Sequence, residues 1–486
     1  MQLILLGLAL AIFMHDTPEI AALGVILPAG WMMLCVWLPK LLLAAGYAWA
    51  CRRTTRKLGQ PYGIRSLNRL NRIAAVLPIF ALMSFVIDLW AGLLSGVRGA
   101  TTPGGTGPRD WVLVDEVAVM LPTLALLTFS YWVYYPIDRR LREATLFSRA
   151  DQGLPLYPVW TRRQFVVSQL RNHFAMVLGP LLVIMTWIET LVKLRAADWI
   201  NDTTQLWLMP VGASVAFVCA PLLMKKMWDT VPLPPGPIRD KLLAMCDRHG
   251  VAVNDLLLWR TFGGMINAAV MGLFGRVRFI LLSDGLLDQV SEREVEAVMA
   301  HELAHVRLKH LWWLLIAAAA GVSVVSAAGD ALVATGIDWP TWAQAVMAAA
   351  GLAAWALGFG WVSRRIERQA DTFGARHMTL VDSEHPATRP DEPEPEPTMI
   401  PTTPATRFDA AGIDAMVGAL QRVADLNHIA TTRRSWRHGS IAWRQAYLRS
   451  LIGQPLQHPP IDRLMRKINA VCLGVLVISV VWALVG

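Results

Sequence analysis

Two histidines and a glutamate in the stretch HELAH have the types and the spacing of a metal-binding catalytic helix. His301 and His305 are four residues apart, so in a helix their imidazoles project from one face and can share a zinc ion. Glu302 lies about 100° further round the helix, where its carboxylate can reach a water on the metal without binding the metal. The pattern predicts a zinc site in which Glu302 is the general base.

A third protein ligand is expected, because catalytic zinc takes three such ligands and keeps one position open. Glu367 and Asp371 are four residues apart in the stretch VSRRIERQADTFGARH. They follow two apolar runs, whose hairpin would return the chain to the histidines. We therefore expect Glu367 to be the third ligand and Asp371 to orient a ligand histidine through its ring N–H. The alternative is a solvated helix in which Glu367 pairs with neighbouring arginines.

The elements that must position these residues are indicated by caps and apolar runs. Ser291 and Glu294 form a capping-box pattern, which predicts a helix from about residue 292. HELAH and the apolar LWWLLIAAAAG that follows are expected to form one continuous helix. His310 then falls off the face shared by the metal ligands and is interpreted as an interfacial residue. Residues 276–282 read as a strand.

The composition predicts an integral membrane protein. Hydrophobic residues make up 55% of the chain and charged residues 17%, with a mean hydropathy of +0.42, which exceeds what a soluble core can bury. The five cysteines show no paired spacing, so neither a disulfide framework nor a cysteine metal site is expected. Eight or nine membrane spans are predicted, at about 26–50, 73–97, 112–135, 174–194, 206–228, 311–329, 341–362 and 469–486, with a shorter segment at 3–14.

Basic residues alternate between the loops and predict the topology. Loops 51–72 and 136–173 are rich in arginine, whereas the loops at 98–111, 195–205 and 330–340 carry few basic residues. The positive-inside rule assigns the first set to the cytoplasm. The same alternation places 229–310 and 363–468 there as well. The net charge of +9 is thereby explained by topology, with the lipid bilayer as the partner and no nucleic acid.

The expected domain organisation follows from these spans. It comprises an N-terminal membrane region (1–228), a first part of the catalytic domain (229–310), a membrane hairpin (311–362), a third-ligand helix (363–380), a disordered acidic and proline-rich loop (381–407), a second part of the catalytic domain (408–468) and a C-terminal membrane helix (469–486).

The chain also resembles a known family in four ordered motifs. They are INAAVMGLFGRVRFILLSDGLLDQVSEREVEAVMAHELAHVRLKH, a membrane hairpin, ERQAD and QHPPIDRL. They are similar to those of the integral-membrane zinc metallopeptidases that include the CaaX prenyl protease 1 and HtpX groups, over about 240–380 and 408–468. The resemblance implies one Zn²⁺ per chain held by His301, His305 and Glu367, with Glu302 as the catalytic glutamate.

The same resemblance implies residues that contact a substrate. It matches Asn267 and Ala268 to the Asn-Ala pair before the strand, and implies that strand 276–282 offers an edge to an extended peptide. His458, followed by two prolines and Arg463, matches the H-P-P element. Whether His458 stabilises an oxyanion or only shapes a turn stays open.

Two further polar groups lie within the spans. Asp88 is either a functional group in a water-filled interior or a partner in an interhelical hydrogen bond. Glu189 has Lys193 four residues on and is interpreted as an ordinary ion pair.

The predicted fold class is therefore mostly α, a multi-pass transmembrane helical protein with a cytoplasm-facing, zincin-like α+β catalytic domain. The predicted function is a membrane-embedded zinc endopeptidase that cleaves membrane-associated or unfolded proteins, in the inner membrane if the source is bacterial. Two other classes remain as alternatives. They are a transporter or channel with an inactive protease fold, and a scaffold or chaperone in which zinc only stabilises the structure.

Overall fold

The computed structural model describes residues 27–60, 63–99, 112–151, 153, 155–263, 265–384 and 405–485, and most of them are helical. The chain divides into two compact units, Met1–Asp229 and Thr230–Gly486. Three predicted segments lie wholly or largely outside the described residues. They are the short membrane segment at 3–14, the loop at 98–111, of which residues 100–111 are not described, and the acidic loop at 381–407, of which residues 385–404 are not described.

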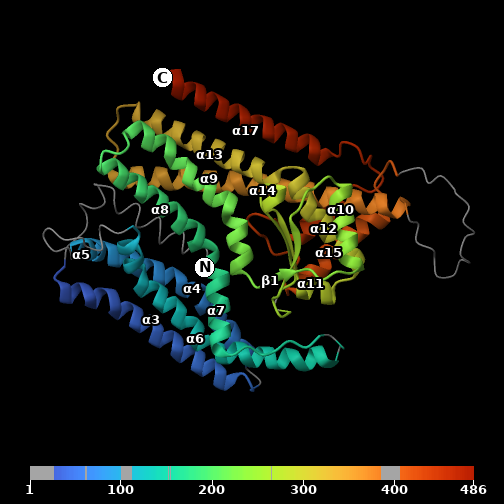
Figure 1. Ribbon diagram of the computed structural model, residues 1–486, viewed down its shortest axis with the longest axis horizontal. Coiled ribbons are helices and arrows are strands. Elements are labelled where there is room, and N and C mark those ends of the chain that lie inside the picture. The colour runs from blue at the N-terminus through green and yellow to red at the C-terminus, as the bar shows by residue number, and fades with distance from the viewer. Residues whose placement is uncertain are drawn as a thin grey trace, which may run out of the picture. The chain divides into compact units, whose positions relative to one another are not determined.

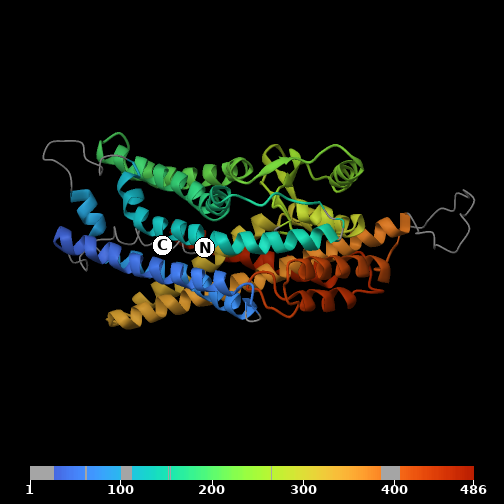
Figure 2. The same cartoon turned by 90° about the horizontal axis from the view of Figure 1, so that it is seen from below.

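The first unit is built from helices alone in its described residues. They are α3 (Ala29–Lys57), α4 (Gly63–Trp90), α5 (Leu93–Gly99), α6 (Val114–Asp151), α7 (Arg162–Leu170), the π-helical turn η2 (Arg171–Ala175), α8 (Met176–Ala196) and α9 (Asp202–Met227). Helices α3, α4 and α6 lie side by side (Figures 1 and 2). Their shared core includes Phe85, Leu94 and Leu127, which are fully buried.

Asp88 is buried between α3 and α4 and has a cationic partner. Lys40 Nζ lies 2.5 Å from Asp88 Oδ2 and 3.0 Å from Ser84 Oγ, and both charged side chains are almost fully buried. Of the two interpretations open at the sequence level, the structure favours the interhelical contact. Glu189 likewise pairs with Lys193, at 3.2 Å, as predicted.

Seven helices in the described ranges are long and apolar enough to cross a membrane. They contain the spans Gly30–Lys57, Gly63–Trp90, Val114–Asp151, Asp202–Met227, His310–Val333, Val346–Ser383 and Pro460–Trp482. Only 6% to 39% of each apolar window is buried within the protein, so their apolar side chains face outward as lipid-facing residues do. The predicted span at 174–194 corresponds to α8, a 21-residue helix that is not among the seven.

The second unit contains a four-stranded sheet in the order β1-β2-β4-β3. Its strands are β1 (Thr230–Pro232), β2 (Asp255–Trp259), β3 (Ala268–Met271) and β4 (Phe279–Ser283). Strand β4 runs parallel to β2 and antiparallel to β3, and all five of its residues are buried. The continuous apolar run FILL is typical of a strand covered on both faces.

The predicted strand at 276–282 therefore needs two corrections. Gly275–Val277 is a 3₁₀ turn, η3, and the strand begins only at Phe279. Because β4 is bonded to a neighbour on each side, it has no free edge for a peptide. The edge strand beside the HELAH helix is β3, the segment that begins with Ala268.

The described residues of the second unit also contain eight α-helices. They are α10 (Pro237–Arg248), α11 (Asp284–Gln289), α12 (Glu292–Arg307), α13 (His310–Val333), α14 (Thr341–Glu384), α15 (Ala410–Leu426), α16 (Ile441–Arg449) and α17 (Pro460–Val485). Helix α14 is 44 residues long and carries both a membrane span and Glu367 without interruption. Helices α13, α14 and α17 run alongside one another (Figure 1).

Helix α12 is fixed between two hydrophobic clusters. One, with Leu256, Ile280 and Met299 in it, joins α12 to the sheet and α10, whereas the other joins it to α14, α15 and α16. Gly374 lets α14 approach closely, since a Cβ there would lie 2.9 Å from Met416 Sδ and 3.5 Å from the His301 backbone nitrogen. These contacts hold the HELAH helix rigidly against the helix that carries Glu367.

The prediction of one continuous helix from HELAH into the membrane is wrong. Helix α12 ends at Arg307, Lys309 adopts the left-handed conformation with φ of 56°, and α13 begins at His310. Both helices pack on α14, but α12 also packs on the sheet and α15 whereas α13 also packs on α17. A break between them lets each follow its own partner.

Candidate metal and active site

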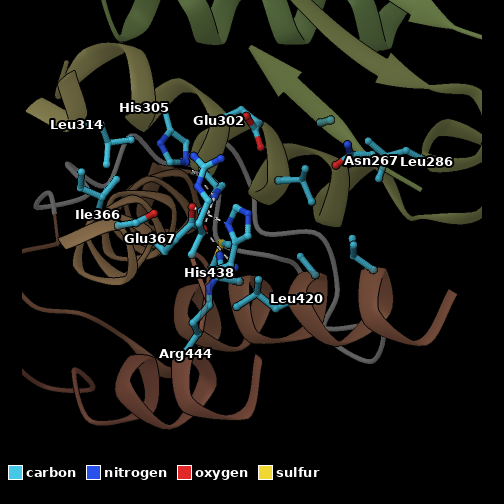
Figure 3. A pocket seen from close by; sticks show the side chains of 18 residues that line it. Asn267, Leu286, Glu302, His305, Leu314, Ile366, Glu367, Leu420, His438 and Arg444 are labelled. Carbon is cyan, nitrogen blue, oxygen red and sulfur yellow. Dashed lines mark hydrogen bonds and ion pairs between the residues drawn. The ribbon is translucent and has the colours of Figure 1, made fainter. Parts of the chain in front are cut away.

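Helix α12 starts where its capping residues predict. Ser291 Oγ accepts from the Glu294 backbone N–H, and Glu294 Oε2 accepts from the Ser291 backbone N–H at 3.1 Å. This confirmed capping box fixes the start of the helix and so the face on which His301 and His305 stand. That face lines a pocket of about 430 Å³ (Figure 3).

Three ligand atoms converge in this pocket. His301 Nε2 and His305 Nε2 are 3.3 Å apart, and His301 Nε2 lies 3.7 Å from Glu367 Oε2. All three donors lie within 4.8 Å of one another. Zinc bonds of about 2.0–2.1 Å in a tetrahedron place two nitrogens roughly 3.3 Å apart, so these side chains fit a zinc ion. His305 and Glu367 point toward one another in Figure 3.

Asp371 lies behind His301, on the side away from the pocket. Its Oδ1 is 3.0 Å from His301 Nδ1, and the carboxylate is fully buried. An acceptor at this position favours the tautomer in which Nδ1 carries the proton and Nε2 offers its lone pair to a metal. The structure thus brings Asp371 to the place that the sequence pattern assigns to it.

Arg444 of α16 joins Asp371 to Glu367. Its Nε and Nη2 donate to the two oxygens of Asp371 at 2.7 and 2.5 Å, while Nη1 lies 3.4 Å from Glu367 Oε2. Burial lowers the pKa of Arg444, but the two carboxylates outweigh it and raise the pKa above its usual range. The guanidinium therefore compensates two buried negative charges that otherwise would oppose folding.

The imidazoles of α12 differ in their electrostatic surroundings. Burial lowers the pKa of His301, but the Asp371 carboxylate outweighs it, so the pKa lies above its usual value. Burial and the nearby rings of His301 and His310 hold the pKa of His305 well below its usual range. His305 is accordingly neutral, the form in which an imidazole binds a metal.

Glu302 lines the same pocket next to the edge strand β3. Burial raises the pKa of its carboxyl to about 7, and the Glu367 charge acts in the same direction. Figure 3 shows its side chain on the strand side of His305. A carboxylate with a raised pKa in a metal pocket is suited to accept and return a proton.

His438 and Arg444 belong to the site, but the sequence interpretation did not single them out. His438 Nδ1 lies 2.9 Å from Glu367 Oε1, and its side chain is 55% exposed. Its loop gave no helical periodicity to interpret. Arg444 did leave a signal: it precedes Leu448 by four residues and shares that apolar, buried helix face. A buried arginine needs a carboxylate partner.

His310 was interpreted as an interfacial residue, and the structure shows a different position. The side chain is almost fully buried, and its Nδ1 lies 3.0 Å from His305 Nδ1. The error follows from assuming a continuous helix, in which residues five apart point about 140° away from each other.

The four residues expected to contact a substrate fall into two groups. Asn267 and Ala268 line the same pocket as His301 and Glu302. His458 and Arg463 line another hollow, of about 500 Å³, with Gln457 and Arg466. His458 has a positive φ of 54° in the turn that precedes α17, so of its two open roles the structure favours shaping that turn.

The part of the chain that forms this pocket is similar to proteins that are already known. The family model "Peptidase family M48" matches residues 261–386. This range includes HELAH and Glu367. Residues 261–386 are therefore similar to the peptidases of family M48. The chain is also similar to the protease HtpX homologs of Bordetella petrii, at 31% identity over 122 residues, and of Herminiimonas arsenicoxydans, at 36% over 67 residues.

These matches cover 23% and 14% of this chain. They also span only 41% and 22% of the two relatives, respectively. Among solved structures, the crystal structure of S. mikatae Ste24p superposes with a TM-score of 0.48 at 15% identity, covering 86% of this chain and 98% of that one. The range matched by the family M48 model includes His301, Glu302, His305, Glu367 and Asp371, whereas His438 and Arg444 lie beyond it.

Proposed function

We propose that the chain is a membrane-embedded zinc metalloendopeptidase that hydrolyses peptide bonds of membrane-associated or unfolded proteins. The observation that carries the proposal is the convergence of His301, His305 and Glu367 in a pocket that also contains Glu302. A bound zinc ion would supply a Lewis acid that acidifies a water molecule and polarises the substrate carbonyl. Each chain would bind one zinc ion through these three ligands.

Glu302 performs the proton transfers in this proposal. Its carboxylate accepts a proton as the water oxygen bonds to the carbonyl carbon. It then gives that proton to the leaving nitrogen as the carbon–nitrogen bond breaks. The products are a carboxylic acid and an amine, and Glu302 returns to its starting form.

Three side chains keep the ligands in place during this reaction. Asp371 orients His301, and Arg444 bridges Asp371 and Glu367. His438 contacts Glu367 on its other oxygen and is exposed to the pocket. It is better placed to meet a substrate than His458, and we assign neither His458 nor Arg463 a part in the reaction.

The free edge of β3 supports a binding mode for the substrate. Ser283 donates its backbone N–H to the Asn267 carbonyl at 3.0 Å, and in an antiparallel pair the bonded residues alternate. Ala269 and Met271 then face β4, so Ala268 and Val270 direct their N–H and C=O groups to the free edge. An extended peptide that paired there would bind through its backbone groups, so the identity of its side chains would have only a weak effect on binding.

A peptide that paired with β3 in this way would lie next to the metal ligands. Ala268 and Asn267 line the pocket together with apolar side chains such as Leu286 and Leu420. The pocket therefore offers hydrogen bonds along one side and an apolar surface along the other. A substrate of this kind is an unfolded or locally extended segment.

The proposal also includes the orientation of the protein in the membrane. Basic loops support a topology in which the second unit's pocket opens to the cytoplasm, with the apolar helices in the bilayer. In a bacterium that bilayer would be the inner membrane. A transporter with an inactive fold would be expected to lack Glu302 or a ligand, and this chain has all four residues.

Metal analysis of the purified full-length protein, combined with a casein cleavage assay, tests the proposal. We expect one zinc per chain, cleavage that stops when a chelator removes the metal, and cleavage that returns when Zn²⁺ is added back. Zinc binding without cleavage would favour the scaffold. Neither zinc nor cleavage would favour an inactive transporter-like fold.

A further inference from the structure

His305 contacts a buried chain of polar side chains that begins at the break between α12 and α13. The left-handed residue Lys309 turns the main chain. His310 can therefore face back to His305, which an unbroken helix would forbid. His310 Nδ1 lies 3.0 Å from His305 Nδ1 and its ring is 1% exposed. The break thus positions a second imidazole directly behind a metal ligand.

The contacts continue from His310 across two more helices. His310 Nε2 is 3.2 Å from Gln369 Oε1, on α14. Gln369 Nε2 in turn donates to Asp462 Oδ1, on α17, at 2.8 Å. Arg376 Nη2 lies 3.3 Å from the other oxygen of Asp462. This series of hydrogen-bonded side chains therefore ends at the Asp462 carboxylate, which Arg376 contacts.

The chemistry of these groups fixes the direction of each hydrogen bond. The Asp462 carboxylate only accepts, so the Gln369 amide nitrogen donates to it and the amide oxygen faces His310. His310 must then carry its proton on Nε2, which makes its Nδ1 an acceptor. Consequently His305 donates from Nδ1 and has its lone pair on Nε2, the atom that lies 3.3 Å from His301 Nε2.

We propose that His310, Gln369 and Asp462 are positioning residues that fix the tautomer and ring orientation of His305 and thereby set the affinity of the site for zinc. This inference rests on the proposed metal site. The two histidine ligands are thus oriented by different means. His301 faces the Asp371 carboxylate directly, whereas His305 is oriented through two neutral side chains that end at Asp462.

Substitutions of His310 separate this role from simple packing. His310→Phe keeps the ring volume but removes the acceptor, whereas His310→Asn loses volume but keeps an acceptor oxygen near the position of Nδ1. Zinc affinity is measured on the full-length protein by competition with a chromogenic chelator. The absorption spectrum of the Co²⁺-loaded protein reports the coordination geometry.

We expect His310→Phe to weaken zinc binding by about 10- to 100-fold and to alter the Co²⁺ spectrum. His310→Asn should stay within about threefold of the wild type. Gln369→Met removes the relay from a second helix and should also weaken binding. His428→Asn and Gln457→Met, exposed positions in the same unit, are matched controls that should change neither readout.

Unchanged affinity in both His310→Phe and Gln369→Met would overturn the relay. So would tighter binding by His310→Phe than by His310→Asn, because that order is the one packing predicts. A wild-type protein that binds no zinc would instead overturn the proposed metal site, and the relay with it.

Discussion

The buried carboxylates of Asp371 and Glu367 need a positive charge nearby, and Arg444 supplies it to both. It donates two hydrogen bonds to Asp371, which is fully buried, and also lies beside Glu367. Removing one partner of such a group leaves an uncompensated charge in the interior, which costs more than the pair itself contributes.

Arg444→Met should therefore lower the free energy of unfolding by about 3–5 kcal/mol. Arg449→Met, an exposed position on the same helix, is the matched control and should stay within about 0.5 kcal/mol of the wild type. Denaturant unfolding in detergent measures both. Equal stability of the two variants would show that Arg444 is not the compensating charge.

His249, at the end of α10, provides a pH dependence that does not involve the proposed zinc ligands. Its Nε2 lies 3.0 Å from His377 Nδ1, and His377 Nε2 lies 3.2 Å from Glu296 Oε1. Burial, then the His377 ring and the positive charges of Arg248 and Arg307, lower the pKa of His249 to about 4 from 6.5.

Because the unfolded chain takes up this proton near pH 6.5 and the folded protein only near pH 4, stability should fall as the pH drops between these values. His249→Gln keeps a donor for His377 but does not titrate. We expect its melting temperature to decline less than that of the wild type over this range, with both proteins measured in a chelator. Parallel declines would contradict the assignment.

The four-residue spacing of the candidate ligands was enough to predict which of them share a helix face. His301 and His305 share a helix face whatever the tertiary fold, and Glu367 and Asp371 do so on their own helix. The contacts of Arg444 and His438 join segments more than 70 positions apart. Which carboxylate each contacts depends on how α14 and α16 pack, and that information is not local.

At the scale of elements, the edge strand beside the pocket is β3, not the strand that the sequence pattern emphasised. The apolar run at Phe279–Ser283 is the more evident β signal, and it is evident because the strand is buried on both sides. An edge strand as short as Ala268–Met271 gives a weak pattern. The break at Lys309 was missed for a similar reason, because neither glycine nor proline marks it.

Peptide substrates with single N-methyl groups test the proposed pairing with β3. Because alternate backbone groups of an extended peptide face the strand, methylation should lower kcat/KM with a period of two residues. Each lost hydrogen bond should cost about 0.5–1.5 kcal/mol, or roughly 2- to 12-fold. Equal effects at consecutive positions would argue against strand pairing.

At the scale of the whole molecule, apolar length and loop charge predicted a multi-pass helical protein, and the described residues contain seven candidate spans. Hydropathy could predict this because every helix in a bilayer must be apolar along about 20 residues. It could not predict that α14 and α17 each join an apolar span to the segment that carries Glu367 or Asp462. Helices of that kind tie the position of Glu367 to the membrane anchor.

The proposed topology predicts which loops reach each side of the membrane. In a background without native cysteines, Arg69→Cys lies in the basic segment 51–72, near the start of α4, and Asp338→Cys lies in the loop between α13 and α14, which has no basic residues. A membrane-impermeant thiol reagent should label Asp338→Cys in intact cells, and should label Arg69→Cys only after permeabilisation. The reverse pattern would invert the protein and place its pocket outside the cytoplasm.

The central claim is that Glu302 moves the proton in a zinc-dependent peptide hydrolysis, and the Glu302→Gln protein tests it most directly. Because Glu302 is not a ligand in this account, the variant should retain one zinc per chain, and its casein cleavage should fall by at least about 10²- to 10⁴-fold. Zinc content and turnover measured on the same preparation decide the matter. Retained cleavage by the zinc-loaded variant would contradict the account.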